Sequence, residues 1–402
     1  MSVFARISSE LQGDRSIWAV LSILAVFSLL VVYSSTGTLA YQKVGGNTEI
    51  FLIRQTVFIF GGLLITYFCH TFNYMRFHRA APYLFFIALP LLFYTLFFGA
   101  NINDARRWIQ IPFTGLTFQT SDFAKLALVI YVARSISAKQ DYIKDWKSAF
   151  IPIIVPVLIV CGLIAPADLS TAVLLFFTCL MMMFVGRVDV RFILSLLILG
   201  LMVFALLIFT ADAFPGFFRV DTWSERIRDF VTNPIGGYQV QQAKIAIANG
   251  EWFGVGPGNS TQRNYLPSSY SDFIYAIICE EYGIIGGTIV ISMYIVLFFR
   301  ITRLVTKSSK AFGAMVALGL GILMITQAFV NIATALHLIP VAGVTLPMVS
   351  RGGTSTLFTC ISFGIILSVT IPLLKAAVET LGWVWSNVLW PALELVWKFF
   401  KE

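Results

Sequence analysis

The sequence predicts an all-α, polytopic integral membrane protein with ten transmembrane helices. Of its 402 residues, 58% are hydrophobic and only 12% are charged, whereas roughly 25% of a soluble globular chain is charged. The mean hydropathy is +0.84. Apolar runs of about 20 residues, the length that crosses a bilayer, recur along most of the chain. Together these observations exclude a soluble globular protein.

Ten apolar runs are the expected transmembrane helices. In chain order they cover residues 17–33, 51–69, 80–99, 121–138, 149–165, 170–186, 192–211, 272–299, 311–333 and 354–374. The first run follows Arg6 and Arg15 and precedes residues 38–40, which loosely resemble a signal-peptide cleavage site. Because many more spans follow, we expect this first helix to be retained.

Basic residues in alternate loops predict the orientation of the bundle. The four loops that carry them hold Arg76 and Arg79; Arg134, Lys139, Lys144 and Lys147; Arg187 and Arg191; and Arg300, Arg303, Lys307 and Lys310. Loops rich in Lys and Arg stay in the cytoplasm. Both termini are therefore expected inside, and a large loop of about residues 211–271, between helices 7 and 8, outside. The same bias explains the net charge of +8, so no nucleic-acid partner is expected.

The outer loop and the C-terminal tail are expected to hold short interfacial helices. In the loop, residues 238–249 place apolar side chains at helical spacing before the turn-rich residues 250–260. The tail, residues 376–402, is rich in Trp and carries Glu379, Pro391 and Glu394. This composition suits a kinked amphipathic helix at the cytoplasmic interface better than an eleventh span. The preceding part of the chain, residues 1–375, is expected to form one membrane domain.

Cysteine and histidine give no sign of a disulfide framework or of a metal site. The five cysteines fall within apolar segments, without CxxC or Cys/His spacing. The three histidines are dispersed and form no HExxH motif. The cysteines are therefore interpreted as small core residues.

Asp272 is the first candidate for a catalytic group. It lies where the polar outer loop turns into the apolar run that begins at Phe273. An acid at this boundary is partly desolvated, which tends to raise its pKa towards a value useful to a general base.

Four other ionisable residues lie within or at the edge of expected spans, where each costs about 2.5–3.5 kcal/mol at the bilayer centre. Asp122 and Lys125 are spaced i,i+3 and can form an ion pair on one helix face. Either they neutralise each other or they belong to a binding site. Glu280 and Glu281 lie about two turns beyond Asp272 and point about 100° apart, which favours a structural role over a catalytic carboxylate pair.

Outward cations beside aromatic residues favour an anionic lipid head group. Arg106 and Arg107 precede Trp108, and Arg226 lies in the outer loop. Arginine binds phosphate through a bidentate fork, although ordinary snorkelling at the interface explains the pattern equally well.

Two further polar residues are candidates with open alternatives. Asp168, between two spans, is either a turn residue or a second outward carboxylate. Ser350 precedes Gly352 and Gly353, and paired glycines allow either a turn or a close approach of the backbone to a ligand. From the residues alone, an enzyme on lipid-linked substrates and a proton-coupled transporter both fit.

Five sequence blocks resemble the signature blocks of the SEDS family of FtsW, RodA and SpoVE proteins, in the family's order. They are DARRWI (104–109), FQTSDFAKLAL (118–128), PADLSTA (166–172), GEWFGVGPGNSTQRNYLPSSYSDFIYAIICEEYGIIGG (250–287) and LIPVAGVTLPMVSRGGTS (338–355). The resemblance covers nearly the whole chain up to about residue 374. It implies ten transmembrane helices and peptidoglycan glycosyltransferase activity. In that activity lipid II is polymerised on the outer face of the bacterial cytoplasmic membrane, with a class B penicillin-binding protein (FtsI-like) and other division proteins as partners.

The resemblance also implies roles for residues at matching positions. Asp272 falls on the aspartate of the family's HTDF block, which is taken as the catalytic acid/base. Asp122 and Lys125 fall on the acid and the lysine of its PSELAK block, with Asp in place of the longer Glu. Within the family the cell-division members fit best, and the elongation members stay open.

The remaining candidates are expected to bind substrate. Arg106 and Arg107 fall on the family's ARRW block and Asp168 on the Asp of its PDLGT block. Arg226 and Ser350 complete the expected set. A divalent cation such as Mg²⁺ is also implied by the family, although the sequence shows no ligand set for it.

The chain departs from the family pattern beside several of these residues. Tyr270 and Ser271 stand where His-Thr is usual, Ser170 replaces a Gly, and Arg351 replaces a common Tyr. These departures put the roles of the flanking side chains in doubt, and not the role of Asp272.

On this resemblance, Asp272 is expected to accept the proton of the 4-hydroxyl of the acceptor lipid II sugar as the undecaprenyl-linked glycan chain is transferred. Arg106, Arg107 and Lys125 are expected to hold the departing pyrophosphate, in a cavity shared with Asp272. A lipid II flippase or transporter and a pure scaffold of the division machinery are the alternatives.

Overall fold

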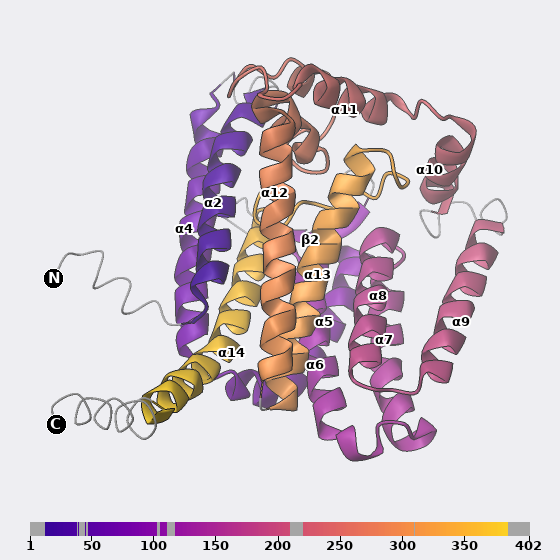
Figure 1. Cartoon of the computed structure of the whole chain (residues 1–402). Helices are drawn as coiled ribbons and strands as arrows, with labels where there is room; N and C mark the ends of the chain where they lie inside the picture. The colour runs from indigo at the N-terminus through magenta and orange to yellow at the C-terminus, as the bar shows by residue number, and fades with distance from the viewer. Residues whose placement is uncertain are drawn as a thin grey trace, which may run out of the picture.

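In the part of the chain that the computed structural model describes, a helix occupies each of the ten predicted apolar runs (Figure 1). The helices are α2 (Arg15–Ser35), α4 (Glu49–Thr71), α5 (Met75–Phe98), α6 (Thr120–Ala138), α7 (Ile151–Ile164), α8 (Leu169–Val185), α9 (Val190–Phe209), α12 (Ile274–Lys307), α13 (Ala311–Ala335) and α14 (Thr354–Val384). A π-helical turn, η2 (Trp146–Phe150), leads into α7. The described residues are 13–37, 39, 45, 47–102, 105–110, 117–209, 220–308 and 310–384, with backbone alone at 101–102, 105–106, 207–209, 220–222 and 373–384.

Length and composition make several of these helices capable of crossing a membrane. Among the described residues, seven helices are long and apolar enough, namely Arg15–Ser35, Glu49–Thr71, Met75–Phe98, Trp146–Ile164, Ile274–Lys307, Ala311–Ala335 and Thr354–Pro372. Leu169–Val185 and Val190–Leu206 are shorter apolar helices, and α6 carries three charged residues, Asp122, Lys125 and Arg134. A multi-pass helical membrane fold is thereby confirmed, while ten as the number of spans stays a prediction.

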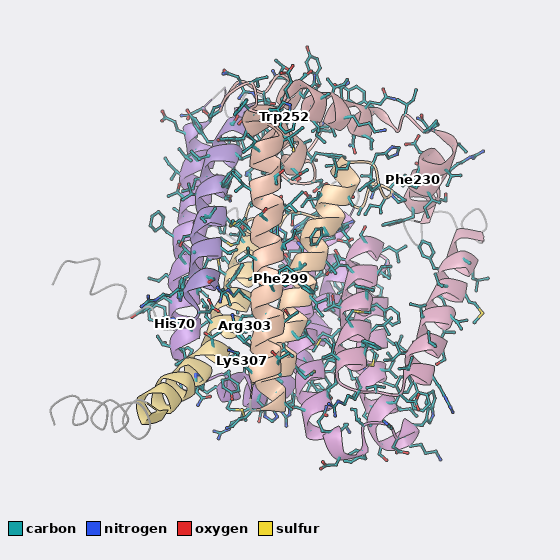
Figure 2. All side chains as sticks on the ribbon, in the orientation of Figure 1. His70, Phe230, Trp252, Phe299, Arg303 and Lys307 are labelled. Atoms are coloured by element: carbon teal, nitrogen blue, oxygen red, sulfur yellow. The ribbon has the colours of Figure 1, made fainter. Side chains whose placement is uncertain are left out.

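The Gly-rich loop, residues 250–260, and a cluster of basic residues lie at opposite ends of α12. Figure 2 shows Trp252 beside one end of this helix, and Arg303 and Lys307 towards the other. This is the arrangement that the charge pattern requires. Which end faces the cytoplasm stays a prediction.

Helix α13 is the centre of the bundle and contacts α6, α8, α12 and α14. Small residues let its neighbours approach closely, as is common between membrane helices. A Cβ on Gly319 would stand 2.5 Å from Met182 Sδ on α8 and 2.7 Å from Val129 Cγ1 on α6. A larger residue there would push both helices away from α13.

A small sheet between α5 and α6 departs from the all-α prediction. Strands β1 (Ala100–Ile102), β2 (Ala105–Gln110) and β3 (Thr117–Gln119) pair antiparallel in the order β1-β2-β3. The register places Trp108 opposite both Ala100 and Gln119. Strands of three and six residues are too short to show a clear alternation of apolar and polar residues, which is why the sequence pattern did not reveal them.

The long loop before α12 contains two helices. The predicted helix over residues 238–249 is confirmed as α11 (Tyr238–Asn249). A second helix, α10 (Val220–Thr232), is amphipathic and carries no continuous apolar run, so it was not predicted. A short 3₁₀ turn, η4 (Gln262–Asn264), lies between α11 and α12.

Helix α12 is interrupted at Gly283, whose backbone angles are φ 68° and ψ −173°. In an unbroken helix the amides of Ile284 and Ile285 would donate to the carbonyls four residues earlier. Here they donate to Glu251 O (2.9 Å) and Trp252 O (3.4 Å) of the Gly-rich loop.

The carbonyls that the interruption frees are also taken up by the loop. Val255 N donates to Glu280 O at 2.9 Å, and Gly256 N donates to Glu281 O at 3.1 Å. The loop backbone thus supplies the hydrogen bonds that α12 cannot make at Gly283.

The predicted boundary at residue 375 falls within α14, which continues to Val384. Residues 385–402 lie outside the described residues. The Trp-rich tail helix therefore stays a prediction.

Candidate active site

Asp272 lies directly before the first residue of α12 and is half-buried. Burial raises the pKa of its carboxyl above the ordinary value, although a hydrogen bond with Ser271 and the positive charges of Arg107 and Arg226 act in the opposite direction. The nearby negative charge of Asp168 raises the pKa further. A carboxylate whose pKa is raised in this way accepts a proton more readily than an exposed one.

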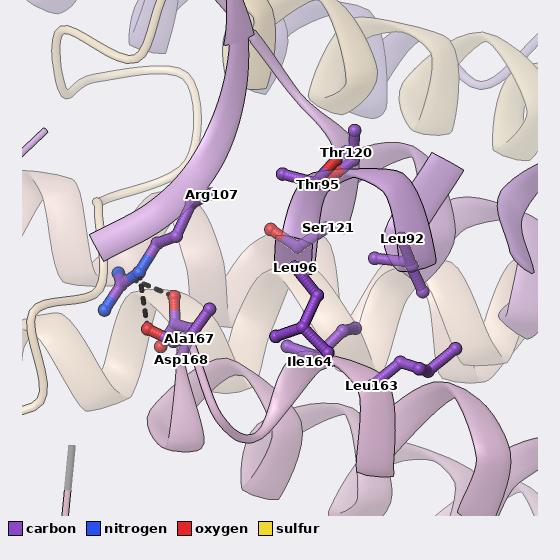
Figure 3. A pocket seen from close by; sticks show the side chains of 10 residues that line it. All are labelled: Leu92, Thr95, Leu96, Arg107, Thr120, Ser121, Leu163, Ile164, Ala167 and Asp168. Atoms are coloured by element: carbon purple, nitrogen blue, oxygen red, sulfur yellow. Dashed lines mark hydrogen bonds and ion pairs between the residues drawn. The ribbon is translucent and has the colours of Figure 1, made fainter. Parts of the chain in front are cut away.

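Arg107 reaches this region from strand β2 and is fixed by the start of α8 (Figure 3). Its Nη1 lies 2.8 Å from Asp168 Oδ2, and its Nε donates to Ala167 O at 2.8 Å. Asp168 caps α8 as well, because its Oδ1 accepts the Thr171 amide at 3.1 Å. Asp168 is thus both a turn residue and the ion-pair partner that orients Arg107.

The ion pair borders a cavity of about 20 Å³ between α5, α6 and α7. Its lining, drawn in Figure 3, consists of Leu92, Thr95, Leu96, Arg107, Thr120, Ser121, Leu163, Ile164, Ala167 and Asp168. A cavity of this size holds about one water molecule, so it does not accommodate a sugar.

Arg226 approaches Asp272 from α10. Its Nη1 donates to Val341 O at 2.9 Å, and its guanidinium lies 5.8 Å from the centre of the Trp223 ring. A Cβ on Gly343 would stand 3.8 Å from both Arg226 Nη1 and Asp272 Oδ2. The acid and this cation therefore lie against the same residue, Gly343, in the segment 336–353 that connects α13 to α14. The sequence pattern did not single out this glycine.

Arg106 precedes Arg107 in strand β2. The side chain of Arg106 lies outside the described residues, so its predicted contact with substrate stays a prediction.

The pair Asp122 and Lys125 forms a separate polar pocket inside the bundle. Lys125 Nζ lies 2.7 Å from Asp122 Oδ1, and the two residues are 8% and 4% exposed. They line a cavity of about 30 Å³ between α6, α13 and α14, with Leu126, Leu323, Met324, Gln327, Ser355, Phe358, Thr359 and Ser362. This lining shares no residue with that of the cavity beside Arg107, so these two cavities are distinct, and a larger cavity shared by Lys125 and Arg107 stays a prediction.

Replacing Lys125 by Met is expected to destabilise the protein by about 3–5 kcal/mol, because the buried Asp122 carboxylate loses its counter-charge. Asp122 Oδ2 already has no hydrogen-bond partner among the described residues. A thermal-unfolding measurement in detergent tests this. The double substitution Asp122→Asn with Lys125→Met should recover most of the lost stability, and a double variant no more stable than Lys125→Met would contradict the ion-pair interpretation.

Ser350 is buried, and both hydrogen bonds of its hydroxyl are with backbone groups. Its hydroxyl donates to Ser271 O at 2.6 Å and accepts the Leu346 amide at 2.8 Å. The structure thus gives Ser350 a contact that positions the residue preceding Asp272. Binding of substrate by Ser350 stays a prediction.

Two departures from the family pattern contact each other. The Arg351 guanidinium lies 5.3 Å from the centre of the Tyr270 ring and 4.5 Å from that of Phe51. The Arg351 amide also donates to Tyr270 O at 3.0 Å. The two departures therefore form one cation–π contact, which the sequence considered position by position could not reveal.

Glu280 and Glu281 hold the Gly-rich loop, as the structural interpretation predicts. The Glu280 carboxylate accepts the Thr261 amide at 3.2 Å and the Ser260 hydroxyl, and Glu281 accepts the Ser34 hydroxyl. Both carboxylates are almost fully buried, and they bind the loop and α2 rather than face Asp272.

The described residues do not provide a complete ligand set for a metal ion. No group of three or more His, Cys, Asp or Glu side chains gathers in the part of the chain that the structure describes. Near Asp272 the second carboxylate is Asp168, and both of its oxygens are engaged by Arg107 and by the Thr171 amide. The described residues around Asp272 therefore do not fit a divalent cation held by protein side chains.

Comparison with known proteins gives a consistent result. A family model described as cell cycle protein, FtsW/RodA/SpoVE, matches residues 14–373. A protein of Trichlorobacter lovleyi named probable peptidoglycan glycosyltransferase FtsW is 33% identical over 355 residues, which cover 86% of this chain and 90% of that protein. A protein of Nitrosococcus halophilus with the same name is 31% identical over 348 residues, which cover 85% of this chain and 88% of that protein.

Solved structures share the fold. A chain from a study of structural coordination of polymerization and crosslinking by a peptidoglycan synthase complex superposes with a TM-score of 0.69 at 23% identity, covering 90% of this chain and 98% of that one. The rod shape determining protein RodA of Thermus thermophilus superposes with a TM-score of 0.63 at 22% identity, covering 89% of this chain and 96% of that one.

Proposed function

The chain belongs to the FtsW/RodA/SpoVE family of cell cycle proteins, and on this premise we propose that it is a peptidoglycan glycosyltransferase that polymerises lipid II during cell division. The relatives at 33% and 31% identity are named probable peptidoglycan glycosyltransferase FtsW. One observation carries the proposal for the site: a half-buried acid, Asp272, with Arg107 and Arg226 close enough for their charges to act on it.

Asp272 is the proposed general base. It takes the proton from the 4-hydroxyl of the acceptor lipid II sugar as that oxygen bonds to the anomeric carbon of the growing glycan chain. The bond between that carbon and the pyrophosphate oxygen breaks, and undecaprenyl pyrophosphate leaves with the bonding electrons. Asp272 then releases the proton to water. A positioned base contributes about 10²–10⁴-fold to the rate, and its raised pKa suits the role.

Arg107 and Arg226 are the proposed partners of the departing pyrophosphate. Charge develops on that group as the bond breaks, and fixed cations stabilise it without rearrangement. Arg107 is held by Asp168 and Ala167, and Arg226 donates to Val341 O, so both guanidinium groups are fixed in place before the charge develops. Arg106 remains a proposed phosphate ligand from the neighbouring position of β2.

The Asp122 and Lys125 pocket is the proposed second contact with the substrate. It lies between α6, α13 and α14, with Ser355 of the first turn of α14 in its lining. Phosphate binding by Lys125 requires its ion pair with Asp122 to open.

The proposed setting is the bacterial cytoplasmic membrane, with Asp272 on the periplasmic side. A class B penicillin-binding protein of the FtsI type and other division proteins are the proposed partners, and lipid II and the undecaprenyl-linked glycan chain the proposed substrates. The family resemblance implies a divalent cation, and the described residues hold no group of three or more His, Cys, Asp or Glu side chains that would bind one. An elongation polymerase of the RodA type is the nearest alternative within the family.

The purified protein in detergent should convert lipid II into glycan polymer without any membrane gradient. The assay is run with and without an FtsI-type partner, because activity can depend on the complex. A flippase or transporter would move lipid II across vesicles and form no polymer, and a pure scaffold would do neither. Absence of polymer with the partner present would overturn the proposed activity.

A further inference from the structure

Three consecutive backbone carbonyls, those of residues 270–272, are each bound by a donor from another part of the chain. The Arg351 amide donates to Tyr270 O at 3.0 Å, and the Ser350 hydroxyl donates to Ser271 O at 2.6 Å. Asn331 Nδ2 donates to Asp272 O at 2.9 Å. The first two donors come from the segment before α14, whereas the third is a side chain of the central helix α13.

Asn331 uses its amide group on two carbonyls. Nδ2 also donates to Val344 O at 2.7 Å, so both of its N–H groups are engaged and the orientation of the amide follows from its partners. The residue is 1% exposed, and its Oδ1 has no hydrogen-bond partner among the described residues. What this side chain contributes is therefore its two hydrogen bonds from Nδ2, which join the backbone of residue 272 to that of residue 344.

The second carbonyl connects Asn331 to the cation beside Asp272. Val344 follows Gly343, the glycine against which Arg226 and Asp272 both lie. Arg226 donates a hydrogen bond to Val341 O in the same connecting segment. One amide thus links the backbone of the acid to the turn that holds the cation.

We infer that Asn331 is a positioning residue that sets the place of Asp272 relative to Arg226. This inference rests on the proposed role of Asp272 as general base. A reacting group misplaced by about 1 Å can lose about 10²-fold in rate, and two hydrogen bonds from a buried helix limit movement of that size. The sequence signal for Asn331 is weak, because Gln327 is a second amide side chain in the same mostly apolar helix.

The test compares Asn331→Leu and Asn331→Ala with Tyr294→Phe in the lipid II polymerisation assay. Tyr294 is a matched control, because its hydroxyl donates to Pro347 O at 2.6 Å, in the same segment between α13 and α14. This hydrogen bond does not involve residues 270–272. Both Asn331 variants should lower kcat about 10- to 100-fold with little change in KM. The Ala variant leaves room for water to satisfy the freed carbonyls and so keeps the protein folded. Tyr294→Phe should stay within about twofold of wild type.

The pH profile separates positioning from general loss of structure. Without Asn331 the Asp272 segment loosens and gains water, so the pKa of Asp272 falls towards its ordinary value. The acidic limb of the rate profile should therefore move to lower pH in the Asn331 variants and stay in place in Tyr294→Phe. An Asn331→Ala protein with wild-type kcat, or a Tyr294→Phe protein with an equal loss, overturns the inference. Asp272→Asn in the same assay identifies the other failure: if it remains active, the role proposed for Asp272 falls and the inference falls with it.

Discussion

Replacing Asp272 by Asn is expected to reduce the rate of lipid II polymerisation by about 10²–10⁴-fold. Asn has nearly the same shape as Asp, so the hydrogen bonds to the backbone of residues 270–272 remain, but the amide cannot accept the proton of the attacking hydroxyl. The measurement is polymer formed per minute by purified protein, with size-exclusion profile and unfolding temperature as checks on the fold. Asp141→Asn is the control, because Asp141 is exposed and lies in the connection after α6.

The pH dependence gives the same prediction a sign. A general base works only when it is deprotonated, so the rate should rise with pH through the pKa of Asp272. Because burial raises this pKa, the acidic limb should lie above the range of an exposed carboxyl, which is near 3.9. The limb should be lost in Asp272→Asn, leaving a low and nearly flat profile. Polymerisation at the wild-type rate by a folded Asp272→Asn protein would remove Asp272 from the mechanism.

Replacing Gly283 by Ala should destabilise the protein by more than about 3 kcal/mol. The backbone angles at Gly283, φ 68° and ψ −173°, are in a region that is almost exclusive to glycine. A Cβ there would overlap the Trp252 carbonyl and stand 2.6 Å from Gly254 N. The loop would have to move away from α12. This movement would break the hydrogen bonds that the amides of Ile284 and Ile285 donate to the loop and those that the carbonyls of Glu280 and Glu281 accept from it. Unfolding temperature in detergent and yield of monodisperse protein measure the effect.

Two other glycines separate the contributions to this loss. Gly258→Ala tests backbone strain alone, since its φ is +81° and an added Cβ meets nothing within 4 Å; it should cost about 1–3 kcal/mol. Gly61→Ala involves neither backbone strain nor a close approach, since Gly61 lies within α4 with open space around its Cβ position. The free energy of unfolding should stay the same or rise by up to about 1 kcal/mol. A Gly283→Ala protein as stable as Gly258→Ala would show that the close approach of the loop is unimportant.

The sequence was sufficient to predict the long helices because their cause is local. An apolar run of about 20 residues in a chain poor in charge has few other uses than to cross a membrane, and the spacing of apolar residues in 238–249 was enough for α11. Helix α10 was not predicted because it carries no such run. The small sheet was not predicted because its strands are short. In both cases the structure depends on neighbours that a local pattern does not contain.

The candidate site was predictable in its members and not in their grouping. Asp272 could be identified because it stands where a polar loop meets an apolar run. Nothing in residue order shows that Arg226 reaches the same glycine as Asp272, or that Lys125 lies in another pocket, because these facts depend on which helices are neighbours. The contact between Tyr270 and Arg351 is of the same kind. Each looked like an isolated departure until the two were seen side by side.

The interruption of α12 has a consequence for how the protein is made. A bilayer offers no hydrogen bonds to backbone groups, so a helix with free amides and carbonyls at Gly283 is poorly suited to leave the translocon for lipid by itself. Its missing partners, residues 251–256, are synthesised first and emerge from the ribosome before α12. The hydrogen bonds of α12 around Gly283 are thus completed only when this earlier segment, already translated, docks against the helix.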